Sequence, residues 1–204
     1  MLKSLIIISP KQFHSGIEAA FKRTNSDIQV YCCENLVDLM LINSEVFQES
    51  RLISFLNEFI IPPFVLEQLG YGGINFHPGP PSYPGHAPYS FAIEDGAKTH
   101  GVTAHEMLEK VDAGRIIAVE VFSIPLNCDY IQLIDLCIQV AAKLLQHLAP
   151  VLVGDKELHY TLDTWGKHKT TQSEYAQKRN EIKGLSEVEK MRRERAFGLP
   201  VNLH

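Results

Sequence analysis

The sequence has no apolar run long enough to suggest a membrane helix. Its longer runs, at residues 5–8 and 39–42, fall far short of the roughly 20 residues that such a helix needs. The N-terminus also lacks a long apolar stretch followed by a small-residue cleavage site, which argues against a secretory signal. We therefore expect no membrane span and a cytoplasmic location.

Several common motifs are missing as well. There are four cysteines and no Cys-x-x-Cys pair, so buried thiols are expected rather than a disulfide framework. No Gly-x-Gly-x-x-Gly turn opens a helix, and no Gly-x-x-x-x-Gly-Lys-Ser/Thr loop occurs, so neither a nicotinamide cofactor nor bound ATP is implied. We also expect no metal, because compact zinc-motif spacing is absent from four neighbouring histidines: His77, His86, His100 and His105.

What the chain does contain is typical of a globular protein. It has 204 residues, of which 45% are hydrophobic and 21% charged, enough for one good-sized core. We expect a catalytic domain over residues 1–155 and a polar, helical extension over 156–204. The extension holds 10 Lys and Arg against 7 Asp and Glu. It could face an anionic ligand or form a solvated helix, but it lacks the interleaved aromatic residues of a nucleic-acid platform.

Strand and helix patterns alternate along the chain. Apolar runs predict strands at 2–9, 28–32, 52–55, 74–76, 101–105 and 116–124. Helical spacing predicts helices at 13–22, 62–69, 89–94 and 130–148, the last capped by Asn127 or Asp129; residues 35–50 fit either structure. This order predicts an α/β fold with a mainly parallel, Rossmann-like open sheet and helices on both faces.

Three polar residues carry the chemistry that the sequence suggests. Asn75 and His77 end a predicted strand, and side chains two positions apart on a strand share one face. If the turn that holds Asp112 lies beside them, the group supplies an oxyanion donor, a proton-shuttling base and a carboxylate to orient that base. Such a set suits acyl transfer without a covalent nucleophile.

Each of these residues also has a plainer interpretation. An isolated Asn-x-His would be better read as a turn residue and a loop histidine, and it is the Asp112 turn that favours catalysis. His105, on a predicted strand with Thr103, is interpreted as structural support for that turn, with direct chemistry as the alternative.

These motifs resemble the folate-dependent formyltransferases, over roughly residues 50 to 150. The signature of that family is Asn-x-His-Pro, a Pro/Gly loop, a Gly-x-Thr-x-His strand and an Asp-x-Gly-x-Ile turn. The segment Trp-Gly-Lys-His-Lys-Thr-Thr at 165–171, with Arg-Ala-Phe at 195–197, is more similar to relatives that formylate amino sugars or other small amines. The matching residues stand in the family's order: Asn75, His77, Pro78, Gly85, Gly101, Thr103, His105, Asp112, Gly114 and Ile116.

The resemblance implies the formyltransferase fold and a transfer of a formyl group from 10-formyltetrahydrofolate to a primary amine. The amine would belong to a small molecule, such as an amino sugar nucleotide. Asn75 and His77 would stabilise the charge on the formyl oxygen. Asp112 would hold His77 or a bridging water and accept the proton that the amine loses, so the rate should fall at low pH.

The resemblance also places the ligands. Backbone groups at Phe59, Ile60 and Ile61 would bind the pterin ring of the folate, completed by the backbone of Lys110 and Val111. Tyr83, Pro84 and Gly85 would face the acceptor, although a purely architectural loop is the alternative. Thr103, His105 and Gly114 would support the site.

The chain also departs from the family. Compared with these relatives, the sequence ahead of Asn75 is expected to be shorter by about one β-α unit. The shortening would fall in residues 33–55, a region that commonly helps to hold the acceptor. The β-rich appendix of tRNA-formylating relatives is absent, which disfavours a large RNA partner. Two other functions stay open: a formyltetrahydrofolate hydrolase, or a non-catalytic folate- or ligand-binding module. A homodimer is also open.

Overall fold

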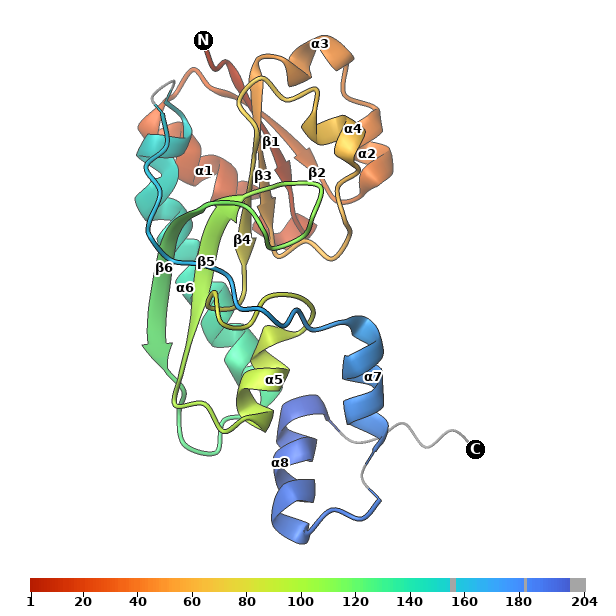
Figure 1. The fold of residues 1–204 in the computed structure, drawn as a ribbon. Coiled ribbons are helices and arrows are strands. Elements are labelled where there is room, and N and C mark those ends of the chain that lie inside the picture. Colours follow the sequence, from red (N-terminus) through yellow and green to blue (C-terminus); the bar gives the residue numbers. More distant parts are fainter. Residues whose placement is uncertain (155–156, 182, 199–204) are drawn as a thin grey trace.

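Six strands form one sheet in the order β2-β1-β3-β4-β5-β6 (Figure 1). The computed structural model describes residues 1–154, 157–181 and 183–198. The first four strands in this order are parallel, whereas β5 runs antiparallel to both β4 and β6. The mainly parallel sheet predicted from the sequence is therefore confirmed. The strands are β1 (Ser4–Ile8), β2 (Gln29–Cys33), β3 (Ser50–Phe55), β4 (Gly73–His77), β5 (Thr99–Glu106) and β6 (Ile116–Ser123).

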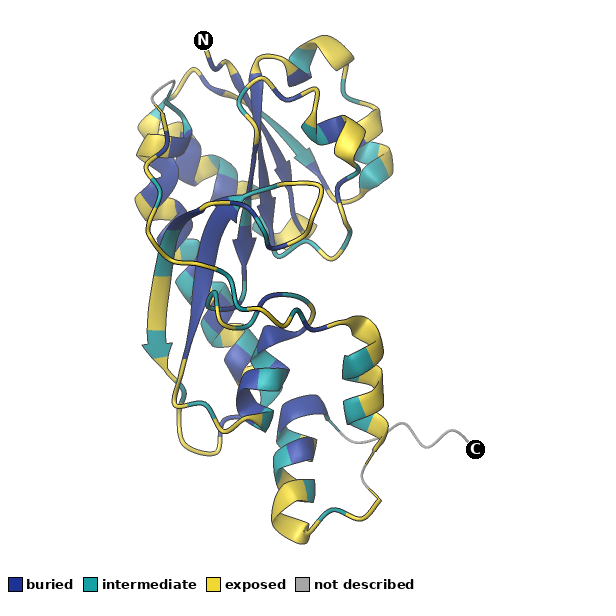
Figure 2. Cartoon of the chain, viewed as in Figure 1, coloured by how far each residue is buried: buried dark blue, intermediate teal, exposed yellow. Residues whose placement is uncertain are grey.

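Helices cover both faces of the sheet, and the alternation of side chains along the strands explains how. On β1, Leu5 and Ile7 pack against α1 (His14–Thr24) and α6 (Tyr130–Leu152). Ile6 and Ile8 point the other way, into a second cluster with α2 (Leu36–Met40), α3 (Ser44–Phe47) and α4 (Pro63–Leu66). A strand buried on both faces is apolar along most of its length, which is why residues 5–8 of β1 form an unbroken apolar run. In Figure 2 the central strands β1 and β3 are accordingly dark blue, whereas the edge strands β2 and β6 are partly exposed.

The structure settles or corrects several predicted elements. Residues 35–50, left open between strand and helix, form the short helices α2 and α3, capped by the side chains of Asn35 and Asn43. The helix expected to run to residue 69 ends at Leu66. The helix α6 begins with a capping box between Asp129 and Gln132, and it continues past the predicted end at 148 to Leu152. Cys33, Cys128 and Cys137 are buried and Cys32 is half-buried, and none forms a disulfide.

The helix α6 is long and apolar enough to cross a membrane by length and composition alone, and it is the one such helix in the part of the chain that the structure describes. The sequence prediction found no such segment. A core helix passes the same test, so the length alone is a weak indication. One side of α6 packs on the sheet through Leu133, Cys137, Ala141, Leu144, Leu145 and Leu148.

The C-terminal part adds α7 (Gln172–Asn180) and α8 (Glu187–Phe197), which confirms the predicted helical extension. Both helices lie beside α5 (Pro88–Glu94) in Figure 1. Phe197 of α8 is fully buried and packs edge-on against Phe91 of α5. The buried Arg193 of α8 pairs with Glu94 of α5 at 2.6 Å. The extension therefore braces the helix that directly follows the proline-rich loop.

Candidate active site

The candidate site lies on the face of the sheet opposite α1 and α6. Ile74 and Phe76 of β4 are buried against those helices, so Asn75 and His77 point to the other face. Their direct partners on β5 lie on the same face, because Asn75 pairs with His105 and His77 pairs with Thr103. Two neighbouring strands thus present polar side chains on one shared patch.

Asp112 converges on this patch from the turn between β5 and β6. Its Oδ2 lies 3.6 Å from Nδ1 of His77, and its Oδ1 lies 3.4 Å from Nε2 of His105. The backbone N–H of Gly85 donates to Oδ2 at 2.7 Å. Asp112, His77 and His105 are only 4%, 3% and 2% exposed. The structure therefore brings together the carboxylate, the imidazole and the amide that the sequence singled out.

The Asp112 turn is fixed by close packing. Asp112 itself has a φ of 43°, a left-handed conformation that is uncommon for a residue with a side chain. A Cβ on Gly114 would lie 2.0 Å from the carbonyl oxygen of Glu106, so a larger residue does not fit there. At the base of the turn, Arg115 holds the Glu106 carboxylate through two hydrogen bonds, and the hydroxyl of Tyr160 donates to the same carboxylate.

Hydrogen bonds assign the roles of the His105 ring nitrogens. Nδ1 lies 2.7 Å from the carbonyl oxygen of Glu106, which can only accept, so Nδ1 carries the proton in the neutral ring. Nε2 then accepts from the amide nitrogen of Asn75 at 3.2 Å. His105 thereby fixes which way the Asn75 amide points. Asn75 is half-buried and is the most accessible member of the group.

The two ring nitrogens of His77 have the reverse roles: Nε2, not Nδ1, bonds to a backbone carbonyl. Its Nε2 donates to the carbonyl oxygen of Tyr83 at 2.9 Å, which leaves Nδ1 facing Asp112. Burial lowers the pKa of His77, although the Asp112 carboxylate opposes this. Burial also acts to raise the pKa of Asp112, but contacts with His105, His77 and the Gly85 N–H outweigh it and hold the pKa at about 2. Asp112 is therefore an anion at neutral pH.

The proline-rich loop after β4 is ordered by buried polar contacts. The Thr103 hydroxyl donates to the carbonyl oxygen of Gly79 at 2.7 Å. Nε2 of His100 donates to the carbonyl oxygen of Pro78 at 3.0 Å. A Cβ on Gly79 would lie 2.6 Å from Nε2 of His77, so only glycine lets the loop pass this close to the imidazole. Gly79 was not singled out from the sequence, and His100 was considered there only as one of four histidines without zinc-motif spacing.

The acceptor residues predicted in this loop contact the site mainly through their backbone. The Tyr83 carbonyl and the Gly85 N–H bind His77 and Asp112, as described above. The side chain of Tyr83 turns away and donates to Asp95 at 3.1 Å. Pro84 is buried, and its carbonyl accepts from the backbone N–H and the hydroxyl of Thr170.

The buried His100 should make folding sensitive to acid. Burial lowers its pKa to about 4 from 6.5, and its Nδ1 has no hydrogen-bond partner among the described residues. As the pH falls, the unfolded chain takes up the proton at a higher pH than the folded chain does. The contribution of His100 to the free energy of unfolding is therefore fully present above pH 6.5 and is lost towards pH 4, by up to about 3 kcal/mol. His77, whose pKa is also lowered, acts in the same direction.

Urea unfolding of the wild type and of His100→Gln, at neutral pH and near pH 4.5, measures this loss. The free energy of unfolding should fall less steeply with pH in the variant, because its buried amide does not titrate. Equal pH dependence in the two proteins would show that His100 is not the source.

The segment predicted to bind the pterin lies between β3 and α4. Phe59 has its backbone N–H and carbonyl tied to the side chain of Asn57, at 3.2 and 2.7 Å. Ile60 is 67% exposed and Ile61 is buried, and their backbone groups make no hydrogen bond with any described residue. Leu56, where this segment leaves β3, has a φ of 52°. Ile60 and Ile61 thus keep free backbone donors and acceptors, whereas Phe59 does not.

The second predicted folate segment has one of its backbone groups occupied. The carbonyl of Val111 accepts from the ammonium of Lys169, while Lys110 is exposed. Met107, at the start of this turn, packs in the same apolar cluster as Phe59 and Ile61. This packing ties the two predicted folate segments together.

A C-terminal segment at 157–171 covers the site, which the sequence did not reveal. It runs across β6 and β5 to α7 (Figure 1), and its Thr161 N–H donates to the carbonyl of Ile116 at 2.8 Å. The Trp165 ring meets the rings of His77 and His105 edge-on, with centroids 5.6 and 4.8 Å away. We call residues 157–171 the covering segment. No local periodicity marks it, and only the resemblance drew attention to part of it.

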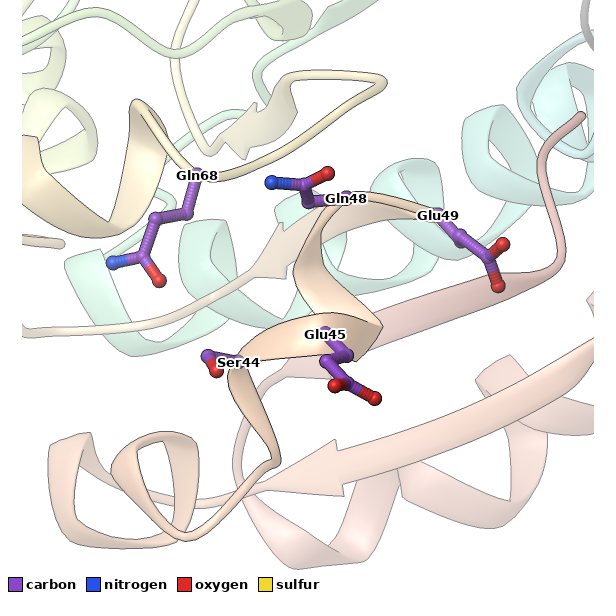
Figure 3. Close-up of a pocket in the computed structure, with 5 residues that line it drawn as sticks. All are labelled: Ser44, Glu45, Gln48, Glu49 and Gln68. Atoms are coloured by element: carbon purple, nitrogen blue, oxygen red, sulfur yellow. The ribbon is translucent and has the colours of Figure 1, made fainter.

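A hollow elsewhere is lined by Ser44 and Glu45 of α3, by Gln48 and Glu49 just after it, and by Gln68 (Figure 3). Glu49, on its rim, directly precedes β3, so the hollow lies at the amino end of that strand. His77 closes the carboxyl end of the parallel neighbour β4. Ligands of open α/β sheets bind at the carboxyl ends of the strands, so the hollow is no rival to the site. Among the described residues, no group of three or more His, Cys, Asp or Glu could hold a metal ion.

Sequence comparison matches the formyl transferase family model to residues 53–145. This range includes every residue assigned to catalysis or to the folate. Methionyl-tRNA formyltransferase from Orientia tsutsugamushi is 40% identical over 86 residues, which make up 42% of this chain and 28% of that protein. The chain thus aligns with less than a third of that relative's length.

Structural comparison extends the similarity to nearly the whole chain. A 4-N formyltransferase from Francisella tularensis superposes with a TM-score of 0.77 at 17% identity, covering 98% of this chain and 89% of that one. The N-formyltransferase from Helicobacter canadensis, solved with folinic acid and dTDP-3-aminofucose, gives a TM-score of 0.75 at 16% identity, covering 97% and 81%. At these identities the likeness shows the fold, which is the predicted formyltransferase fold. The formyl transferase family model matches residues 53–145, the part of the chain that carries Asn75, His77 and Asp112.

Proposed function

We propose that this protein transfers a formyl group from 10-formyltetrahydrofolate to a primary amine. The single observation that carries the proposal is the convergence of Asp112 on His77 and His105, beside Asn75. The match to the formyl transferase family over these residues supports the same reaction. Asn75, His77 and Asp112 are the proposed catalytic residues, and His105 is a positioning residue.

In this reaction the amine nitrogen attacks the formyl carbon, the bond from that carbon to N10 of the folate breaks, and N10 takes up a proton. Negative charge gathers on the formyl oxygen meanwhile. Asn75 would donate to this oxygen through the amide N–H that His105 does not use. The Nε2–H of His77 would also donate to it, with the formyl oxygen replacing the carbonyl of Tyr83 as acceptor.

The role of Asp112 follows from where the proton of the attacking amine goes. With a pKa of about 2, Asp112 stays ionised at neutral pH and is a weak final base. We assign it the task of holding the amine and stabilising the positive charge that develops on its nitrogen, before the proton passes to N10. The predicted fall in rate at low pH would then come from protonation of the acceptor amine, because Asp112 itself does not titrate between about pH 5 and 8.

The folate would bind beside β4. Free backbone groups of Ile60 and Ile61 support binding of the pterin there, as predicted. The backbone of Val111 would take part once Lys169 leaves its carbonyl, whereas Phe59 would act through its side chain. Tyr83, Pro84 and Gly85 would border the acceptor through their backbone.

For the acceptor we propose a small molecule, with an amino sugar nucleotide as the leading candidate. The Helicobacter canadensis relative holds dTDP-3-aminofucose, and the similarity in fold to it covers nearly all of this chain. The methionyl-tRNA formyltransferases suggest a tRNA acceptor instead, but their similarity covers less than half of the chain.

The assay incubates the protein with 10-formyltetrahydrofolate alone, with dTDP-3-aminofucose, or with methionyl-tRNA, and follows the release of tetrahydrofolate. Faster release with the amino sugar, together with a formylated product, supports the proposal. If only methionyl-tRNA speeds the release of tetrahydrofolate, the acceptor is the tRNA and not an amino sugar. Release of formate that ignores both amines would favour a hydrolase, and no release would favour a binding module.

A further inference from the structure

The covering segment is fastened on both sides of the catalytic group. On the side of the Asp112 turn, Nε1 of Trp165 donates to the carbonyl of Gly114 at 2.8 Å. On the side of the proline-rich loop, the N–H of Gly166 donates to the carbonyl of Pro81 at 2.8 Å. Thr170 then binds the loop through the carbonyls of Pro84 and His86. The segment therefore bridges the two loops that carry the reacting groups.

Between these fastenings the indole of Trp165 lies against both imidazoles that flank Asp112. Its plane makes angles of 78° with the His77 ring and 84° with the His105 ring. Asp112 Oδ1 is buried and has no hydrogen-bond partner among the described residues. A polar cavity beside such an atom would take up water, because a buried carboxylate oxygen without a partner is costly. Trp165 packs on the two imidazoles that flank this atom, where its apolar ring would exclude a water molecule.

We propose that Trp165 is a positioning residue that keeps water away from the Asp112 and His77 pair, so that the formyl group passes to an amine and not to water. This inference rests on the proposed formyl transfer. The two outcomes differ only in the nucleophile. In hydrolysis a water oxygen attacks the formyl carbon, the bond to N10 breaks, N10 gains a proton, and formate is released. A water held between Asp112 and His77 would be poised for that attack.

The test compares three variants by the ratio of formate to total tetrahydrofolate released from 10-formyltetrahydrofolate, with dTDP-3-aminofucose present and absent. We expect Trp165→Ala to raise formate release from the donor alone by about tenfold, because water reaches an acid–base pair. Trp165→Phe, which keeps an apolar ring, should stay close to the wild type. Leu162→Ala is the matched control, since Leu162 lies on the same segment and is fully exposed.

A merely structural role for Trp165 would lower both reactions together and leave the ratio unchanged. That result in Trp165→Ala, with normal transfer in the wild type, would overturn the inference while the proposed function stands. The absence of formyl transfer in the wild type itself would instead refute the proposed function.

A second measurement does not depend on turnover. Trp165 is the single tryptophan of the chain, so its fluorescence reports on this site alone. Protonated imidazole quenches indole on contact, so emission should fall as the pH is lowered and His77 takes up a proton. In His77→Asn the pH dependence should change, whereas in His147→Asn, at an exposed position of α6, it should not. Identical curves in all three proteins would show that the indole does not contact His77 in solution.

Discussion

Replacing His77 by asparagine is expected to lower kcat for formyl transfer by about 100- to 1000-fold, the usual cost of losing one oxyanion donor. The Nε2–H of His77 is the donor that would meet the developing charge, and the shorter asparagine side chain cannot reach the same point. The pairing of His77 with Asp112 is lost at the same time. The KM for 10-formyltetrahydrofolate should change little, because the pterin is assigned to the backbone near Ile60. Steady-state release of tetrahydrofolate measures both constants.

The exposed His147 supplies the control, because His147→Asn makes the same chemical change far from the site. Far-UV circular dichroism and urea unfolding check that the His77 variant is folded, which matters because His77 is buried. A folded His77→Asn protein with a kcat near that of the wild type would remove His77 from the mechanism. The match to the formyl transferase family model would be unaffected by that result.

Arg193→Ala is expected to lower the free energy of unfolding by about 3–5 kcal/mol, the usual cost of removing one partner of a buried ion pair. Arg193 is 7% exposed and binds Glu94 through Nε and Nη2, at 2.9 and 2.6 Å. Its Nη1 also donates to the carbonyls of Lys178 and Glu181. Its removal leaves a largely buried carboxylate and two carbonyls without their donor. Urea unfolding followed by circular dichroism measures the loss.

Lys190→Ala is the matched control on the same helix. Lys190 pairs with Glu187 at 2.7 Å, but both side chains are exposed, so the expected change is below about 1 kcal/mol. A change in Arg193→Ala as small as in the control would show that α8 contributes little to the fold. The rate of formyl transfer should also fall in Arg193→Ala. The helix α5 directly follows the proline-rich loop, whose backbone hydrogen-bonds to His77 and Asp112.

Part of the candidate site could be placed from the sequence because its signals are local. Asn75 and His77 lie two residues apart at a strand end, and strand geometry alone puts them on one face. Gly114 and Asp112 stand in one short turn, so their spacing is preserved in any fold that keeps the turn. The folate segments were predicted only through the family resemblance. Neither that resemblance nor the local pattern predicted the hydrogen bonds between the Asn57 side chain and the backbone of Phe59.

Ring nitrogen assignments could not be predicted, because each depends on a carbonyl supplied by the fold. The Nε2–H of His77 meets the carbonyl of Tyr83, and the Nδ1–H of His105 meets that of Glu106. The helix ends were missed for a related reason. Residues 35–50 became helices through the caps Asn35 and Asn43 and through packing on β1 and β3, which an apolar run alone does not specify.

The order of strands and helices along the chain, the shared face of Asn75 and His77, and the resemblance to the formyl transferase family follow from the sequence alone, since periodicity and motif spacing act over a few residues. The tertiary structure alone decided that Asp112 touches both imidazoles and that Trp165 covers them. The hydrogen bond from Trp165 to Gly114 joins residues 51 positions apart. Contacts at such separations depend on how whole segments pack, and no local pattern in the chain encodes that packing.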